Sequence, residues 1–464
     1  MNIALVFLLA YGAAMVAAGL WIGRRVQASS TFFVAGRRLG PGLLFATILA
    51  ANIGAGSTVG AASLGYRDGF AGWWWVGAAG IGTILLGLVV GPRLWRVAKA
   101  HDLRTVGDHL EWRYGKSVRA TVAVLLWLGT LAILAGQLIA MAWVLNAVAG
   151  VPKTIGCLLG GGVMVLYFAA GGLLASAWIN LVQLIVLLVG FVVALPLAIR
   201  AAGGFDALQA PWDGAPPIVD GASAGLFLLP LLVPAFIVSP GLIQKLYGAR
   251  DASTVRRGVA LAGVALLAFA ALPPLLGMAA RVLHPDLAQA DLALPMLLVH
   301  DLPPAIGLLG LAAVFSAEIS SADALLFMLA TSLSRDLYQR FVHPQASDAQ
   351  VLRVARGAAV VGGAAGIVLA MQLPSVIDAL RIFYALLTVT LTVPLLGGLV
   401  RSRAGTREAL AAMIAGVVGL FAARAWVGAG HALGPLVSPT FAALLLSALV
   451  FLVVERLPSR AASA

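Results

Sequence analysis

The chain has 464 residues, of which 61% are hydrophobic and only 10% are charged, and its mean hydropathy is +1.02. Because soluble domains carry about 25% charged residues, this composition excludes a soluble enzyme. The net charge of +12 does not indicate nucleic-acid binding, because the 30 lysine and arginine residues lie in short clusters between long apolar runs. Cys157 is the single cysteine, which excludes an intrachain disulfide and a cysteine-based metal cluster.

The apolar stretches, bounded by glycine, proline and charge clusters, predict an all-α polytopic membrane protein with about 13 transmembrane helices. In chain order the expected spans are 3–22, 41–63, 70–92, 120–147, 154–171, 174–200, 222–243, 258–281, 303–333, 354–372, 376–400, 407–428 and 435–454. The first stretch is expected to be a retained helix, because Arg24 and Arg25 follow it and no positive charge precedes it, the reverse of a signal peptide. No linker interrupts the series, so residues 1–464 are expected to form one transmembrane domain.

The distribution of positive charge predicts the orientation of these helices. With thirteen spans and an outside start, most lysine and arginine residues fall in loops on the cytoplasmic side. We therefore expect the N-terminus outside and the C-terminus in the cytoplasm, in an inner or plasma membrane. Trp73, Trp74 and Trp75 are expected to form a membrane-interface belt rather than a ligand cage.

Acidic residues deep in a membrane are costly and usually functional, and here Glu318 and Asp323 lie well inside the ninth span. Helical periodicity places Ala317, Ser320 and Ser321 on one face, with Asp323 close to Ser320. Hydroxyl and carboxylate oxygens, together with a freed backbone carbonyl, are suitable ligands for sodium. The alternative is that the serines only pack and satisfy each other between helices.

Freed carbonyl groups require a broken helix, and two spans carry the signals for one. The second span reads LAANIGAGSTVGAA and the seventh reads LLPLLVPAFIVSPG. Paired breaks five helices apart indicate a five-plus-five inverted repeat whose broken helices form a site at the membrane midplane.

Five segments in order resemble motifs of the sodium:solute symporter family, which has the leucine-transporter fold. They are FFVAGRRLG, LRTVGDHLEWRYG, YFAAGGLLASAWINLVQ, LIQKLYGARD and SSADALLFMLATSLSRDLY. The last is closest to the choline-transporter branch. The resemblance covers about residues 31–400 and implies an inverted-repeat core at about 41–400, with peripheral helices at 3–22, 407–428 and 435–454.

The resemblance also implies a sodium site between the broken second helix and the ninth helix. Its residues in this chain are Ala50, Ile53, Ala317, Ser320 and Ser321. Members with a second sodium site add an aspartate on the sixth helix, where this chain has Asn180. An amide does not supply that charge, so either one sodium ion is absent, which we favour, or Asp323 replaces the aspartate. Na+ is the expected coupling ion, with no organic cofactor.

The expected substrate is a small carboxylate rather than a sugar. The segment IGAGS offers backbone N–H groups at the start of a half-helix, which favours a carboxylate. A sugar would find few partners for its hydroxyl groups on the second and seventh helices. The candidate substrate-binding residues are Gly54, Ala55, Gly56, Ser57, Gln137, Ala235 and Phe236. Gln137 is equally explained as an amide that joins two helices.

The roles of two ionisable residues stay open. Arg381 could meet an anionic substrate in the outer vestibule, although Asp378 at i−3 favours a structural ion pair. Glu318 either couples transport to protons or hydrogen-bonds within the bundle.

These observations predict a sodium-coupled secondary symporter that imports an amino acid or monocarboxylate by alternating access, and not an enzyme. The alternatives are a proton-coupled carrier of the same fold, using Glu318 or Asp323, and a transporter-like solute sensor. The expected partners are the solute and the lipid bilayer, with no nucleic acid and no obligate protein partner.

Overall fold

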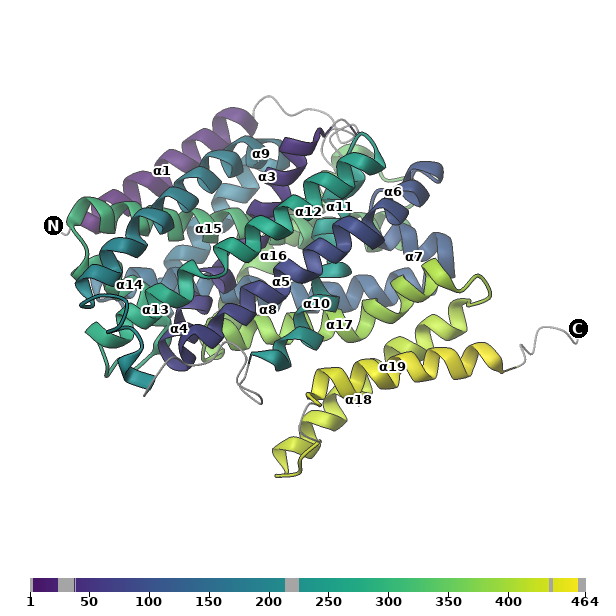
Figure 1. Cartoon of the computed structure of the whole chain (residues 1–464). Helices are drawn as coiled ribbons and strands as arrows, with labels where there is room; N and C mark the ends of the chain where they lie inside the picture. The colour runs from purple at the N-terminus through teal and green to yellow at the C-terminus, as the bar shows by residue number, and fades with distance from the viewer. Residues whose placement is uncertain (1–2, 24–36, 38, 213–224, 434–436, 458–464) are drawn as a thin grey trace, which may run out of the picture.

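The computed structural model describes residues 3–23, 37, 39–212, 225–433 and 437–457, with the backbone alone at several positions that include 166–181 and 323. Within these residues the protein is a bundle of helices without a strand, which confirms the all-α prediction (Figure 1). Ten segments of the described chain are long and apolar enough to cross a membrane. The protein is therefore a multi-pass membrane protein.

The helices follow each other along the whole described chain. In order they are α1 (Ile3–Gly23), α3 (Pro41–Asn52), α4 (Val59–Asp68), α5 (Trp73–Leu85), α6 (Gly91–Ala100), α7 (Val106–Tyr114), α8 (Lys116–Ala149), α9 (Lys153–Ala201), α10 (Leu229–Ile237), α11 (Pro240–Tyr247), α12 (Ala252–Phe269), α13 (Leu272–Leu283), α14 (Ala293–Met296), α15 (Pro304–Thr331), α16 (Asp348–Gln372), α17 (Val376–Val400), α18 (Thr406–Gly428) and α19 (Pro439–Arg456). Short 3-10 or π segments join several of them, among which η2 (Ala55–Ser57), η8 (Leu297–Asp301) and η9 (Ser332–Val342) matter below.

Both predicted helix breaks are present. The second span ends its first half at Asn52, and extended backbone at Ile53 and Gly54 separates α3 from η2 and α4. The seventh span is divided into α10 and α11 at Val238 and Ser239, where Pro240 starts the second half. Proline fits the first turn of a helix but cannot continue one from the preceding residues without losing a hydrogen bond.

The predicted boundary between spans 154–171 and 174–200 is not a helix end in the structure, but α9 is much longer than the roughly 20 residues of one crossing, so the two crossings stay a prediction. The backbone is helical throughout the 49 residues of α9. The prediction used the Gly171-Gly172 pair as a boundary, but glycine is common inside membrane helices and does not by itself end one. The two halves of α9 nevertheless have different neighbours, because Gly156 lies against Ala142 of α8 and Gly190 lies against Ala313 of α15.

Loops predicted to lie on the same side of the membrane contact each other. At the predicted cytoplasmic end the contacts are Arg37 with Asp102, Arg340 with Glu111, and Arg113 with the carbonyl oxygen of Arg401. At the predicted outer end Lys153 donates to the carbonyl oxygen of Leu373, and Arg281 lies over the Tyr66 ring. The assignment of these loops to two sides is therefore consistent with the folded chain.

Helix α15 lies among α1, α3, α8, α9 and α16. Helices α18 and α19 pack on each other and on α17, at the edge of the bundle (Figure 1). The backbones of α4 and α13 approach each other closely, because a Cβ atom at Gly277 would overlap the carbonyl oxygen of Ala62. This contact requires glycine because neither backbone can move away without repacking its helix.

We expect Gly277→Ala to lower the thermal midpoint of the detergent-solubilised protein, because the added methyl group forces α4 and α13 apart at a cost of about 1–3 kcal/mol. Gly357→Ala is the matched control, since a Cβ atom at Gly357 of α16 meets no atom within 4 Å. The control should be neutral or slightly stabilising, by up to about 1 kcal/mol. Equal midpoints for the two variants would show that the close approach is absent.

Candidate ion and substrate site

The break in the second span lies against α15 through a direct hydrogen bond. The Ser321 hydroxyl donates to the carbonyl oxygen of Ile53 at 3.1 Å, and both residues are buried. The Ile53 carbonyl is outside the helical part of α3, so it is available to a side chain. Ala50, Ala317 and Ser320 are buried on the same two helices. The structure thus joins two of the five residues of the predicted sodium site and places the other three on the same elements.

Gln137 of α8 binds the unwound segment through its side-chain amide. Its Oε1 atom accepts a hydrogen bond of 2.9 Å from the Ala55 backbone N–H, and its Nε2 atom has no hydrogen-bond partner among the described residues. A Cβ atom at Gly54 would overlap Ser321 Oγ and lie 3.0 Å from Gln137 Oε1, so only glycine fits between α8 and α15.

The expectation of a row of bare backbone N–H groups is wrong at two positions. The Ala55 N–H is bound to Gln137, and the Ser57 N–H donates to the Gly54 carbonyl oxygen at 2.9 Å. The cause is the 3-10 turn of η2, whose i to i+3 geometry closes the second of these bonds locally. The donor that the structure offers instead is the side-chain amide of Gln137.

Glu318 faces the same break from α15. Thr58 Oγ1 lies 2.9 Å from Glu318 Oε1 and 3.0 Å from the Gly54 carbonyl oxygen. The side chain of Glu318 is 0% exposed, and its Oε2 atom has no hydrogen-bond partner in the described part of the chain. Glu318 is therefore a hydrogen-bonded residue at the break, as one of its two sequence interpretations proposed.

Aromatic side chains border the break on the side of α5, α10 and α17. Ala235 and Phe236 are buried on α10, and the Phe236 ring lies 5.3 Å from the ring of Tyr384 on α17. The Tyr384 ring is in turn 6.0 Å from that of Trp75, whose Nε1 atom is 3.2 Å from the position of a Cβ atom at Gly56.

The assignment of Trp75 to an interface belt is wrong, because this residue is only 3% exposed and packs beside the break, whereas Trp73 and Trp74 are partly exposed. A run of three tryptophans does not reveal which ring points inward. Tyr384 was also missed, since one tyrosine in an apolar helix gives no local signal.

The remaining predicted residues are not part of this cluster. Arg381 of α17 forms no salt bridge with Asp378 in the described structure, although the charge of Asp378 acts on Arg381. Asp378 accepts the hydroxyl of Ser375, the N-cap of α17, at 2.6 Å. The structural role of the pair stays a prediction. Asn180 and Asp323 have helical backbone in α9 and α15, and their side chains lie outside the described residues.

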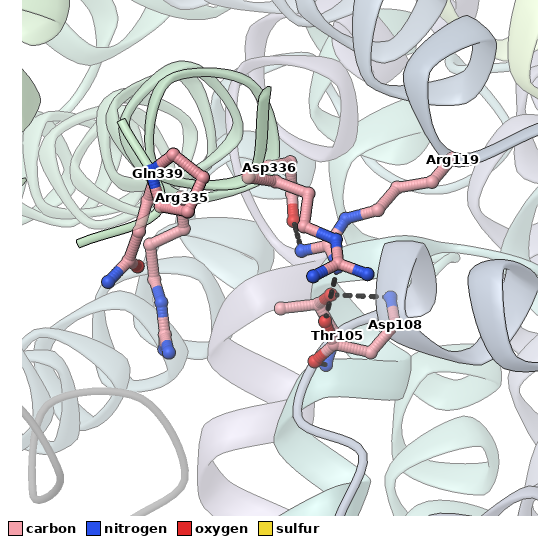
Figure 2. A pocket seen from close by; sticks show the side chains of 8 residues that line it. Thr105, Asp108, Arg119, Arg335, Asp336 and Gln339 are labelled. Carbon is pink, nitrogen blue, oxygen red and sulfur yellow. Dashed lines mark hydrogen bonds and ion pairs between the residues drawn. The ribbon is translucent and has the colours of Figure 1, made fainter. Parts of the chain in front are cut away.

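A separate cavity of about 300 Å³ lies at the predicted cytoplasmic end, and Figure 2 shows Arg119 reaching between Asp336 and Asp108 at its edge. Arg119 of α8 contacts Glu111 at 2.7 Å, Asp108 at 3.1 Å and Asp336 at 2.5 Å, and Arg340 also pairs with Glu111. Because these opposite charges neutralise each other, the cluster ties α7 and α8 to η9 and is not a free anion site.

A bundle of membrane helices with a broken second and seventh span, unwound beside an oxygen-bearing helix, defines a secondary transporter. The family model of the sodium:solute symporter family matches residues 32–416. The chain therefore belongs to the sodium:solute symporter family, and its coupling ion is Na+.

Curated relatives transport different solutes. The chain is 30% identical over 446 residues to the sodium/pantothenate symporter of Escherichia coli, covering 92% of this chain and 90% of the relative. It is 26% identical to the sodium/glucose cotransporter of Vibrio parahaemolyticus, covering 76% and 71%. It is 23% identical to the high-affinity choline transporter 1 of Caenorhabditis elegans, covering 86% and 74%.

A solved structure of a Na+-coupled sialic acid symporter, in a substrate-bound outward-open state, has the same fold. The TM-score is 0.80 at 19% sequence identity, and the alignment covers 98% of this chain and 96% of the other.

The cytoplasmic ion cluster predicts a pH-dependent stability. Burial alone would raise the pKa of Glu111, but hydrogen bonds from Arg119 and Arg340 outweigh it and hold that pKa below its ordinary value of 4.5. A depressed folded-state pKa stabilises the protein above the unfolded pKa and loses that effect as pH falls through the folded value. Glu111→Gln should therefore lower the thermal midpoint at neutral pH, with a difference that narrows below pH 4.5.

Thermal unfolding of the two proteins across pH measures this difference. Asp286→Asn, at an exposed position on the opposite end, is the control and should leave the midpoint unchanged. A Glu111→Gln deficit that stayed constant down to acidic pH would contradict the proposed ion pairing.

Proposed function

We propose that this symporter imports a small carboxylate, an amino acid or a monocarboxylate, together with Na+ by alternating access. The observation that carries the proposal is the convergence of Ser321 and Gln137 on the two sides of Gly54. One side chain brings a hydroxyl oxygen for a cation, and the other brings amide N–H donors for an anion. A single unwound segment can therefore bind both ligands.

The proposed sodium site consists of oxygen atoms on α3 and α15. The Ile53 carbonyl and the Ser321 hydroxyl are already within hydrogen-bond distance, and Ala50, Ala317 and Ser320 contribute further oxygens on the same helices. Neutral oxygens of this kind suit a hard cation. A cation held here links the break to α15, so sodium binding favours one arrangement of the two elements.

The proposed carboxylate site uses the Nε2 group of Gln137. The hydrogen bond from Ala55 fixes Oε1 on the backbone, which directs the two N–H donors of Nε2 elsewhere. The half-helix α4 begins at the same place, and the positive end of its dipole favours a negative charge. Ala235, Phe236 and the neighbouring aromatic rings then contact an apolar substrate body.

The relatives support this class without naming the substrate. Pantothenate and sialic acid, named for two of them, are carboxylates, whereas glucose and choline are not. Against a sugar, the second and seventh spans present Gly54, Gly56, Ala235 and Phe236 near the break, which leave sugar hydroxyls without partners.

We further propose that the chain forms one transmembrane domain in an inner or plasma membrane, with its N-terminus outside and its C-terminus in the cytoplasm. The arginine-rich loops that contact each other at one end of the bundle support this orientation. The chain transports rather than catalyses, and no protein partner is needed for the site. Uptake driven by a pH gradient without sodium would instead indicate a proton-coupled carrier, and ligand binding without counterflow would indicate a sensor.

Replacing the two serines tests the sodium site. We expect Na+ but not K+ to raise the thermal midpoint of the purified protein, and Ser320→Ala and Ser321→Ala to reduce this shift and to abolish sodium-driven uptake in proteoliposomes. Ser447→Ala is the matched control, because this buried serine donates to the Ala412 carbonyl oxygen between α18 and α19, away from the break. Unchanged sodium dependence in both site variants would refute the assignment.

The Gln137→Glu variant tests the carboxylate site. Glutamate keeps an oxygen for the Ala55 N–H but replaces the free donors by a second acceptor. We expect the sodium shift to remain and the affinity for the carboxylate to fall by about tenfold or more, which corresponds to roughly 1.4 kcal/mol. Thermal shifts with amino acids, short carboxylates, choline and sugars in sodium measure this, and Gln137→Leu should show the same loss. Full carboxylate affinity in both variants would exclude a contact with Gln137.

A further inference from the structure

The carboxyl oxygens of Glu318 are short of hydrogen-bond donors. Thr58 Oγ1 lies within 3.0 Å of both the Gly54 carbonyl oxygen and Glu318 Oε1. A hydroxyl group has one hydrogen and cannot fully satisfy two acceptors. Glu318 Oε2 has no partner at all in the described chain. The Gly54 carbonyl oxygen also accepts the backbone N–H groups of Ser57 and Thr58. The two oxygens of Glu318 therefore share one donor, the Thr58 hydroxyl, in a place that water does not reach.

Burial makes this shortage energetically important. Glu318 and Thr58 are both 0% exposed. A carboxylate buried at this depth needs a bound cation, a paired side chain or an added proton, because an isolated charge is strongly disfavoured away from water. No lysine, arginine or histidine in the described structure forms an ion pair with Glu318, and no described charge acts on it electrostatically.

The ionisable groups on the elements around α15 bind partners other than Glu318 or lie near helix ends. Tyr11 of α1 bonds Ser316, and Arg119 of α8 belongs to the cytoplasmic cluster. Asp301 of η8 pairs with His284. The neighbouring α3 and η2 carry no ionisable side chain, and α9 and α16 have their lysine, arginine and aspartate residues near the helix ends, at Lys153, Arg200, Asp348, Arg353 and Arg356. No fixed side chain among these is placed to neutralise Glu318.

We propose that the two carboxyl oxygens of Glu318 and the Thr58 hydroxyl form a second site for a monovalent alkali cation, for which Na+ is the natural occupant. One carboxylate with a neutral hydroxyl oxygen matches a hard ion of single charge. A divalent site is not favoured, because no group of three or more His, Cys, Asp or Glu residues in the described chain is placed to hold a metal.

The second site rests on the proposed function, since it lies beside the first sodium site on the same two elements. Thr58 follows η2 in the broken second span, and Glu318 follows Ala317 on α15. Glu318 thereby supplies the negative charge that Asn180 lacks at the second-site position of related chains. With this second site the protein binds two sodium ions, in place of the single ion that the sequence favours.

The number of bound ions tests the proposal directly. Purified wild-type protein should bind two 22Na+ ions at saturation, and sodium-driven uptake in proteoliposomes should couple two ions to each solute molecule. Glu318→Gln keeps the size of the side chain and an acceptor for Thr58, but removes the charge. We expect this variant to bind one ion, and its uptake to depend on the first rather than the second power of sodium concentration.

A second pair of variants tests the same site independently, in case Glu318→Gln misfolds. Thr58→Ser retains the hydroxyl oxygen and should keep both ions, whereas Thr58→Val removes it and should lose one. A wild-type protein that binds one sodium ion, or that moves a proton with a single sodium ion, would overturn the second site and leave the first intact. The absence of any sodium-driven uptake by the wild type would instead refute the proposed function itself.

Discussion

The unwound backbone at Ile53 and Gly54 is the constraint on which the site depends. Inside a membrane there is no water to satisfy a freed carbonyl or N–H group, so the protein must provide each partner. Ser321 of α15 provides one for Ile53, and Gln137 of α8 provides one for Ala55. Three helices that are distant in sequence are thereby fixed around one break, and the space between them is so small that Gly54 has no room for a side chain.

Local signals in the sequence were sufficient to predict the helices and their breaks, but not which residues contact each other across the fold. Glycine and proline runs predicted both breaks, and helical periodicity placed Ser320 and Ser321 on one face, because each depends on residues a few positions apart. The Gly171-Gly172 pair predicted a helix end that α9 does not show, because a local pattern does not distinguish a glycine inside a membrane helix from one at its end. Thr58 and Glu318 meet across 260 residues, a contact that no local pattern reveals.

Charged side chains have different partners at the cytoplasmic end and at the centre of the protein. At the cytoplasmic end, Arg119 and Arg340 are matched by Asp108, Glu111 and Asp336 in short contacts. At the centre, Glu318 has one neutral hydroxyl and no cationic side chain as partner. A permanent ion pair holds helices in one arrangement, whereas a counter-charge that arrives from solution can also leave. The central arrangement is the one that suits a transport cycle.

In the proposed site, coupling between ion and solute follows from the shared segment rather than from long-range communication. Gln137 orients its free donors through the Ala55 N–H, while Ser321 binds the adjacent Ile53 carbonyl, so both ligands act on neighbouring residues of one break. A cation that orders this segment against α15 also places Ala55, and with it the amide that meets the solute. By thermodynamic linkage, a solute bound to that amide must strengthen cation binding by the same factor. On this proposal, the break is where the energy of the sodium gradient is passed to the solute.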